Sequence, residues 1–331
     1  MSSTKSAFGF FDNSIERLSR TPAQKLSRRS FLATFGGGLV GAAAAAQAGD
    51  YDCRSGQLTP IKVPGGPMPQ LNANLTFMFN EVPVLERFGA AAKVGFRAVE
   101  FLFPYEFPAA QIREQLDRHR LQMILFNMPP GDWAAGDRGL ACDPARIGQF
   151  QENVSKAVEY ARALGCGQIH CMAGLKPRGV NEETMRATYI ANLQFAGKEL
   201  AKHNLKLLIE AINTRDIPGY YLNYSRQAFD IMHYADVPNL YFQYDIYHMQ
   251  IMEGDLAPTI EKNLAKIAHM QLADNPGRHE PGTGEINYPF LFAFFDKIGY
   301  KGWIGCEYRP AGKTEDGLGW IKPYLKSEVA G

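Results

Sequence analysis

The 331-residue sequence contains only 5 cysteines, and none of them forms a Cys-x-x-Cys pair. This scarcity argues against a disulfide-stapled scaffold and against a cysteine-rich zinc site. An odd number of cysteines cannot pair completely within one chain. We therefore expect these cysteines to be small buried hydrophobic residues.

The sequence also has little net charge, +1 overall. Six of the 35 basic residues and two of the 34 acidic residues lie in positions 1–48, which leaves the rest of the chain weakly acidic, at about −3. Such a balance excludes the charge signature of a nucleic-acid-binding protein and of a polybasic membrane patch. With 46% hydrophobic residues, the chain has enough apolar material for a folded core.

Two further motifs are absent beyond residue 48. No stretch of 18 apolar residues occurs there, so we expect no stable membrane span once a leader is removed. No Gly-x-Gly-x-x-Gly or Gly-x-x-x-x-Gly-Lys motif follows a predicted strand, which argues against a nucleotide-binding doubly wound fold.

The first 48 residues resemble a twin-arginine (Tat) signal peptide. Arg28 and Arg29 precede an apolar run rich in glycine and alanine, which ends in the small-x-small pattern Ala46-Gln47-Ala48. We expect the Tat export machinery to be a partner and the protein to be periplasmic or otherwise extracytoplasmic. The alternative is an alanine-rich helix that happens to follow two arginines. Residues 49–70, rich in proline and glycine, are predicted to form a linker or arm.

From residue 71 to 331, short apolar runs alternate with longer amphipathic segments. The predicted strands are Ala73–Phe79, Ala98–Phe101, Met123–Asn127, Gln168–Met172, Leu205–Glu210, Leu240–Asp245, Ile267–Leu272 and Trp303–Glu307. The predicted helices are Val84–Val94, Ala109–His119, Gln149–Leu164, Glu182–His203, Ser225–Tyr234, Leu256–Leu264, Tyr288–Ile298 and Gly317–Leu325. Eight β/α units of this kind predict an α/β fold, a single (β/α)8 TIM barrel with a parallel sheet.

Four oxygen-bearing side chains stand at the ends of predicted strands five to eight: Glu210, Asp245, Gln271 and Glu307. Their separations of 35, 26 and 36 residues correspond to one β/α unit each. Because active sites of parallel barrels lie at the C-terminal ends of the strands, we expect these side chains to converge. Converging carboxylates repel one another unless a cation or protons neutralise them, and an all-oxygen set favours Mg2+ or Mn2+ over zinc. The alternative is that each acid makes a separate salt bridge or helix cap.

Longer motifs surround these four residues. They are Ile209–Asn213, Gln243–Met249, His269–Pro276, Pro281–Tyr288 and Gly305–Tyr308, preceded by Gly95–Phe101, Gly131–Gly136 and Tyr160–Gly165. Together they resemble the hydroxypyruvate isomerase family, which belongs to the xylose-isomerase-like barrels. The resemblance implies a divalent metal held by Glu210, Asp245, Gln271 and Glu307. Related ketose 3-epimerases carry histidine at the third metal position, so Gln271 favours the hydroxypyruvate isomerase branch.

The resemblance also implies an activity, the interconversion of hydroxypyruvate and tartronate semialdehyde through an enediolate. Glu210 and Glu307 are then the catalytic acid/base pair, flanking the substrate plane. Further residues are predicted to bind substrate, with a purely structural role as the alternative for each: His248, Arg278, Asp216, Trp133 and Glu100. His170 is expected to be a core histidine.

Two other functions stay open at this point. One is a 3-epimerase or isomerase of a larger free sugar, which would not need a positive group such as Arg278 beside the metal. The other is an exported sugar-binding barrel without turnover, although binding alone does not require both Glu210 and Glu307. The sequence leaves open whether the chain forms a homo-oligomer.

Overall fold

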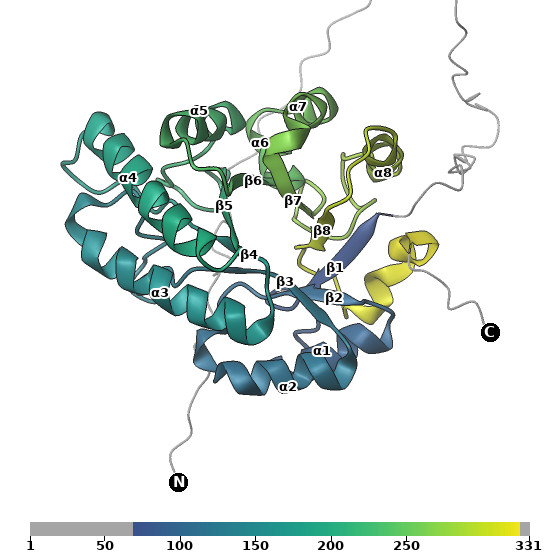
Figure 1. The fold of residues 1–331 in the computed structure, drawn as a ribbon. Helices are drawn as coiled ribbons and strands as arrows, with labels where there is room; N and C mark the ends of the chain where they lie inside the picture. The colour runs from purple at the N-terminus through teal and green to yellow at the C-terminus, as the bar shows by residue number, and fades with distance from the viewer. Residues whose placement is uncertain (1–68, 325–331) are drawn as a thin grey trace, which may run out of the picture. The chain divides into compact units, whose positions relative to one another are not determined.

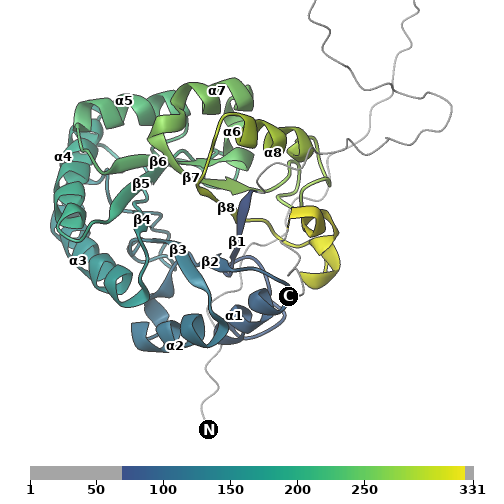
Figure 2. The same cartoon turned by 45° about the vertical axis from the view of Figure 1, so that its right-hand side comes forward.

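The computed structural model describes residues 69–324. The predicted signal peptide of residues 1–48 lies outside the described residues, as does all but the end of the predicted arm of residues 49–70. The described chain forms a closed barrel of parallel strands that follow one another in sequence order, with helices around the outside (Figure 1). Figure 2 shows the ring of strands inside the ring of helices. The predicted TIM barrel is thereby confirmed.

The elements alternate as the sequence pattern predicts. The strands are β1 (Gln70–Asn74), β2 (Ala98–Glu100), β3 (Gln122–Asn127), β4 (Gln168–His170), β5 (Lys206–Glu210), β6 (Leu240–Asp245), β7 (Ile267–Leu272) and β8 (Trp303–Cys306). The α-helices are α1 (Val84–Lys93), α2 (Ala109–His119), α3 (Ile147–Leu164), α4 (Glu182–Ala201), α5 (Ser225–Ala235), α6 (Ile246–Met252), α7 (Leu256–Asn263) and α8 (Tyr288–Lys297). The 3-10 helices are Pro104–Glu106, Pro144–Arg146, Leu264–Lys266 and Glu315–Tyr324.

The predicted first strand, Ala73–Phe79, is wrong in both of its bounds. β1 ends at Asn74, because the Asn74 side chain accepts a hydrogen bond from the Thr76 amide (3.0 Å) and its carbonyl accepts one from the Met78 amide (2.9 Å). An asparagine that bonds to the backbone two residues on closes a turn. The apolar residues after Asn74 are therefore a buried loop rather than a strand.

Two helices differ from the sequence prediction in existence or type, whereas the bounds of the others agree within two residues. α6 was not expected, and it begins directly after Asp245, whose side chain accepts hydrogen bonds from the Tyr247 and His248 amides and so acts as the N-cap. The predicted final helix, Gly317–Leu325, is a 3-10 helix over Glu315–Tyr324 instead. Pro323 inside this segment has no amide hydrogen to donate to a regular helical ladder.

Apolar residues form two layers on either side of the sheet. The larger layer lies between strands and helices and includes fully buried Ile209 and Phe242. The smaller cluster contains Ala98, Ile124, Leu125 and Leu208. Leu208 precedes Glu210 by two residues and so lies on the same face of β5. This smaller cluster lies in the barrel interior below Glu210.

Cys142, Cys166, Cys171 and Cys306 are buried and unpaired, as predicted, and Cys53 lies outside the described residues. Within residues 69–324, no helix combines the length and the apolar character that a membrane crossing needs.

Gly139 should be more sensitive to substitution than Gly136, although both have φ near +105°. A Cβ at Gly139 would collide with the backbone of Met172, whereas one at Gly136 would meet open space. Each alanine substitution should cost about 1–3 kcal/mol through backbone strain, and only Gly139→Ala should add about 1–3 kcal/mol of overpacking. Urea unfolding of both variants measures the difference, and equal losses would contradict this packing.

Candidate active site

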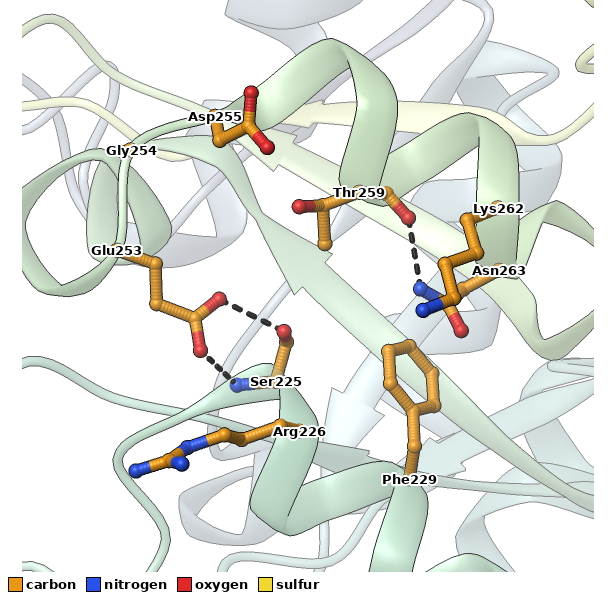
Figure 3. Close-up of a pocket in the computed structure, with 9 residues that line it drawn as sticks. All are labelled: Ser225, Arg226, Phe229, Glu253, Gly254, Asp255, Thr259, Lys262 and Asn263. Carbon is orange, nitrogen blue, oxygen red and sulfur yellow. Dashed lines mark hydrogen bonds between the residues drawn. The ribbon is translucent and has the colours of Figure 1, made fainter.

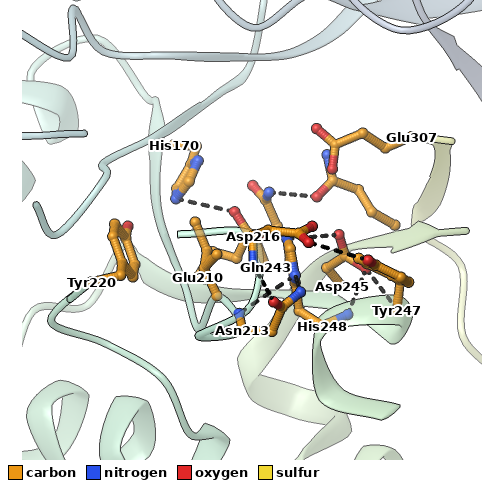
Figure 4. Close-up of polar contacts among 12 residues, drawn as sticks. His170, Glu210, Asn213, Asp216, Tyr220, Gln243, Asp245, Tyr247, His248 and Glu307 are labelled. Carbon is orange, nitrogen blue, oxygen red and sulfur yellow. Dashed lines mark hydrogen bonds and ion pairs between the residues drawn. The ribbon is translucent and has the colours of Figure 1, made fainter. Parts of the chain in front are cut away.

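The four side chains predicted at the barrel rim all lie at its C-terminal mouth. Glu210 ends β5, Asp245 ends β6, Gln271 lies one residue before the end of β7, and Glu307 follows β8. All four side chains are buried. A carboxylate oxygen of Glu210, one of Asp245 and a ring nitrogen of His248 lie within 4.8 Å of one another (Figure 4). We call the set of Glu210, Asp245, Gln271 and Glu307 the acidic mouth.

Arg278, in the loop after β7, links the acids. Its guanidinium lies 2.8 Å from Glu307 Oε2, 3.1 Å from Asp216 Oδ2 and 3.6 Å from Asp245 Oδ2. Burial lowers the pKa of Arg278, but these three carboxylates together raise that pKa above its ordinary value. The guanidinium is therefore a permanent positive charge within the acidic mouth.

Aromatic rings and the backbone hold Arg278 in place. The rings of Phe77 and Tyr247 lie 4.9 and 5.0 Å from the guanidinium carbon, within the range of cation–π attraction. The φ of Arg278 is +58°, in the left-handed region that residues with a side chain rarely adopt. Such backbone strain persists only where the surroundings enforce it, and it concentrates at functional sites.

The carboxylates of the acidic mouth resist ionisation. Burial raises the pKa of Glu210 well above its ordinary value, and the neighbouring Glu307 and Asp245 raise it further. Burial likewise raises the pKa of Glu307 and of Asp245, against the lowering effect of Arg278. Three carboxylates face one guanidinium, so the mouth carries a surplus of negative charge whenever all three ionise.

Two carboxylate oxygens of the acidic mouth indicate whether a metal ion fits there. Glu210 Oε1 and Asp245 Oδ2 are buried and accept no hydrogen bond from the described residues. A buried carboxylate oxygen that accepts no hydrogen bond is costly, and a cation bound to it would lower that cost. Carboxylate and amide oxygens are the ligands that Mg2+ and Mn2+ prefer. The residues of the acidic mouth therefore fit the predicted metal.

His248 directs a ring nitrogen toward the same two oxygens without forming a hydrogen bond to either. Its Nδ1 faces the Asn213 amide nitrogen at 2.6 Å, and the Asn213 carbonyl oxygen is already engaged by two backbone amides. Nδ1 therefore accepts, and the neutral ring carries its proton on Nε2, which lies 3.7 Å from Glu210 and 3.5 Å from Asp245. A protonated Nε2 has no lone pair for a metal, so His248 is suited to contact substrate oxygens.

The remaining predicted substrate contacts lie in different surroundings. Asp216 receives hydrogen bonds from Arg278 and, at 3.3 Å, from the Tyr247 hydroxyl. Trp133, in the loop after β3, packs against the Phe103 ring at 5.1 Å, and the Arg138 guanidinium carbon lies 3.9 Å from the centre of the Trp133 ring.

Glu100 lies at the end of β2 and is fully enclosed by protein groups. Burial raises its pKa, but His269 and hydrogen bonds from Asn72 and Gln271 lower that pKa below the ordinary value. Its two oxygens accept hydrogen bonds from neighbouring side chains, and contact between Glu100 and substrate stays a prediction.

Sequence reasoning did not foresee two residues near the acids. His170, expected in the core, lies on β4 with Nε2 3.6 Å from Glu210 Oε2, and burial lowers its pKa to about 3. Asn74 donates to both Glu100 (2.9 Å) and Glu307 (3.2 Å). Asn74 is the last residue of a barrel strand, a position typical of active-site residues. The predicted strand Ala73–Phe79 placed Asn74 near its start, so this position was not recognised.

A separate cavity of about 440 Å³ lies on the outside of the barrel, beside α5 and α7 (Figure 3). Its carboxylate Glu253 accepts hydrogen bonds from the backbone amide and hydroxyl of Ser225, and the Asn263 amide donates to the Thr259 carbonyl. The first pair of bonds joins the start of α5 to the end of α6 and the last lies within α7, so these polar groups already have partners and the acidic mouth remains the candidate site.

The metal-free protein should lose thermal stability as the pH rises from about 6.5 to 7.5. Folding raises the pKa of Glu210, Asp245 and Glu307, so their contribution to stability is lost as the pH rises through the folded pKa. His170 and His248, whose pKa burial lowers, oppose this only below the ordinary histidine pKa of about 6.5.

Tm measurements with EDTA and with Mn2+ check this expectation. The Tm in EDTA should fall over the interval, Mn2+ should remove the fall, and a Glu210→Gln variant should show a shallower slope. A Tm in EDTA that rises over the same interval would show that the acids are not held protonated by the fold.

Comparison with known proteins places this site in a family. Residues 88–324 match the family of xylose isomerase-like TIM barrels. The chain is 52% identical to the 2-oxo-tetronate isomerase of Cupriavidus necator over 258 residues, which are 78% of this chain and 99% of that relative. It is 48% identical to the hydroxypyruvate isomerase of Escherichia coli over 257 residues, 78% of this chain and 100% of that relative.

A solved structure is similar to this chain in both sequence and fold. The AP endonuclease, family 2, from Brucella melitensis shares 48% sequence identity and a TM-score of 0.77, covering 78% of this chain and 100% of that one. The resemblance to hydroxypyruvate isomerases that the motifs predict is confirmed at this level. The chain therefore belongs to the xylose isomerase-like TIM-barrel family, and it is an enzyme of the isomerase class.

Proposed function

We propose that this chain is a divalent-metal-dependent aldose–ketose isomerase that interconverts hydroxypyruvate and tartronate semialdehyde. Relatives named hydroxypyruvate isomerase and 2-oxo-tetronate isomerase support a small hydroxy-oxo acid as the substrate. The observation that carries the proposal is the pair of buried glutamates, Glu210 and Glu307, with raised pKa values beside the guanidinium of Arg278.

The metal would be held by the four residues of the acidic mouth. When bound, Mg2+ or Mn2+ supplies positive charge that stabilises an oxyanion forming next to a carbonyl. Ionisation of the three carboxylates and occupation of the site support each other, because each carboxylate needs a cation and the cation needs charged ligands.

The reaction requires three proton movements. A base removes one hydrogen from C3 of hydroxypyruvate, which leaves an enediolate; an acid then delivers a proton to C2, and the hydroxyl proton moves from the C3 oxygen to the C2 oxygen. Glu210 and Glu307 serve as base and acid, and the roles exchange when the direction reverses. A pKa raised toward neutral suits a group that must both take and return a proton. His248 Nε2–H faces Glu210 and donates to a substrate oxygen.

Arg278 supplies the recognition of the carboxylate. Its guanidinium lies 2.8 Å from Glu307 and 3.6 Å from Asp245. With a cation held by these two acids, the guanidinium would be available to bind the planar carboxylate of a 2-oxo acid, a pairing that arginine makes in bidentate geometry. A neutral sugar offers no such partner.

A deuterium-exchange assay tests the proposed reaction. Hydroxypyruvate in D2O with the Mg2+-loaded chain should lose its C3 proton signal in the NMR spectrum while an aldehyde signal appears. Glu210→Gln and Glu307→Gln should each slow this exchange by about 10²- to 10⁴-fold, because each removes one proton-transfer group. EDTA should abolish exchange in the wild type.

The same assay separates the alternatives. Exchange that survives in both glutamine variants would overturn the assigned acid/base pair. A neutral ketohexose turned over in preference to hydroxypyruvate would favour a sugar epimerase or isomerase, and Mn2+ binding without turnover of either would favour a binding protein. The four-carbon 2-oxo-tetronate is the second candidate substrate, since a relative at 52% identity is named for it.

We also propose that the chain is exported through the Tat pathway, on the basis of Arg28, Arg29 and the apolar run that follows them. Replacing both arginines by lysine should keep a fusion of residues 1–48 to a fluorescent reporter in the cytoplasm, whereas the wild-type fusion should reach the extracytoplasmic fraction. Equal distribution of the two fusions would contradict the assignment.

A further inference from the structure

We propose that Glu100 is a positioning residue, which fixes the side-chain amide of Gln271 so that its carbonyl oxygen faces the metal. The inference rests on the metal site of the proposed function. It assigns to Glu100, at the end of β2, a role that needs no contact with the substrate.

Glu100 is surrounded by four side-chain donors from two strands, β1 and β7. Its Oε1 accepts from Asn74 Nδ2 (2.9 Å) and Gln271 Nε2 (2.8 Å). Its Oε2 accepts from Asn72 Nδ2 (2.8 Å) and His269 Nε2 (2.8 Å). Glu100 is 1% exposed, so water does not take the place of any of these partners. An ionised carboxylate only accepts hydrogen bonds, and all four neighbours must therefore donate.

This requirement decides the orientation of Gln271. An amide has two orientations of nearly the same shape, and only one of them presents the oxygen to a metal. Because Gln271 Nε2 donates to Glu100, Oε1 lies on the other side of the amide, where it also accepts from Gln243 Nε2 at 2.6 Å. A carbonyl oxygen has two lone pairs, so one remains for an ion.

Strand β8, which pairs with β1 and β7, leaves space for the Glu100 side chain. Gly305 on β8 has no side chain at the point where the Glu100 carboxyl group lies, and a Cβ there would collide with both carboxylate oxygens and the carboxyl carbon. Gly305 also pairs with Gln271 in the sheet register. Gly305, which leaves space for the Glu100 carboxylate, is thus directly opposite Gln271, which that carboxylate orients, in the β7–β8 pair.

The test exchanges the carboxylate and the amide between positions 100 and 271. Mn2+ binding to the full-length chain is measured by the EPR signal of free Mn2+. Glu100→Gln keeps the shape but places an NH2 group among donors, so the Kd for Mn2+ should rise about 10- to 100-fold, as is usual when support for a metal ligand is lost. Gln271→Glu should also raise Kd, because two carboxylates then face each other.

The double variant, Glu100→Gln with Gln271→Glu, should recover most of the lost affinity. The amide introduced at position 100 can then donate to the carboxylate introduced at position 271, whose other oxygen faces the metal, and the total charge is that of the wild type. A residue that only filled space would show no loss in Glu100→Gln and no recovery in the double variant.

Glu280 and Gly317 form a matched control pair. Glu280 is also buried, accepts hydrogen bonds from the Ala311 amide, and occupies the place that a Cβ of Gly317 would need. Glu280→Gln and Gly317→Ala should leave the Kd for Mn2+ unchanged, whereas Gly305→Ala should raise it as Glu100→Gln does. If Glu100→Gln does not fold, the comparison of Gly305→Ala with Gly317→Ala decides the question.

The outcomes separate this inference from the proposed activity. A wild-type Kd in Glu100→Gln, or a double variant no better than Glu100→Gln, overturns the positioning role. Mn2+ binding with the expected charge-exchange pattern but no turnover of hydroxypyruvate overturns the proposed activity and supports the positioning role. Absence of Mn2+ binding in the wild type overturns both.

Discussion

The concentration of negative charge in the barrel mouth is the constraint on which the rest of the structure depends. Four acidic side chains are buried there: Glu100, Glu210, Asp245 and Glu307. The guanidinium of Arg278 lies beside Asp245 and Glu307. Removing an ion from water costs several kcal/mol in a protein interior, so such a cluster persists only with protons or cations to neutralise it. The raised pKa values of three of these acids express that cost, and the divalent ion that we propose would lower it.

The scaffold supplies what the acids need from two directions. From below, amide and imidazole groups on β1 and β7 surround Glu100 with donors and keep it charged. From above, the loop after β7 brings in Arg278 at a strained backbone angle. The arrangement of the mouth follows from side chains that hold other side chains in place, as the outer partners of metal ligands do in known metal sites.

The barrel and the four strand-end positions could be predicted from the sequence, because their spacing repeats once per β/α unit. Asp245 as a helix cap was also readable, but α6 is too short for a periodicity signal. The partners of Glu100 could not be predicted. Asn74 was hidden by a wrong strand end, and the Glu100–Gln271 contact joins residues 171 positions apart, so it depends on barrel closure rather than on any local pattern.

The measurement that tests the central claim most directly is a count of the protons released when Mn2+ binds. Titration calorimetry of the metal-free chain at about pH 7, in buffers of different ionisation enthalpy, gives that count. If Glu210, Asp245 and Glu307 share protons in the metal-free state, binding of each Mn2+ should release roughly one proton or more. Binding without proton release would mean that the acids are already ionised, and the charge balance described for the mouth would be wrong.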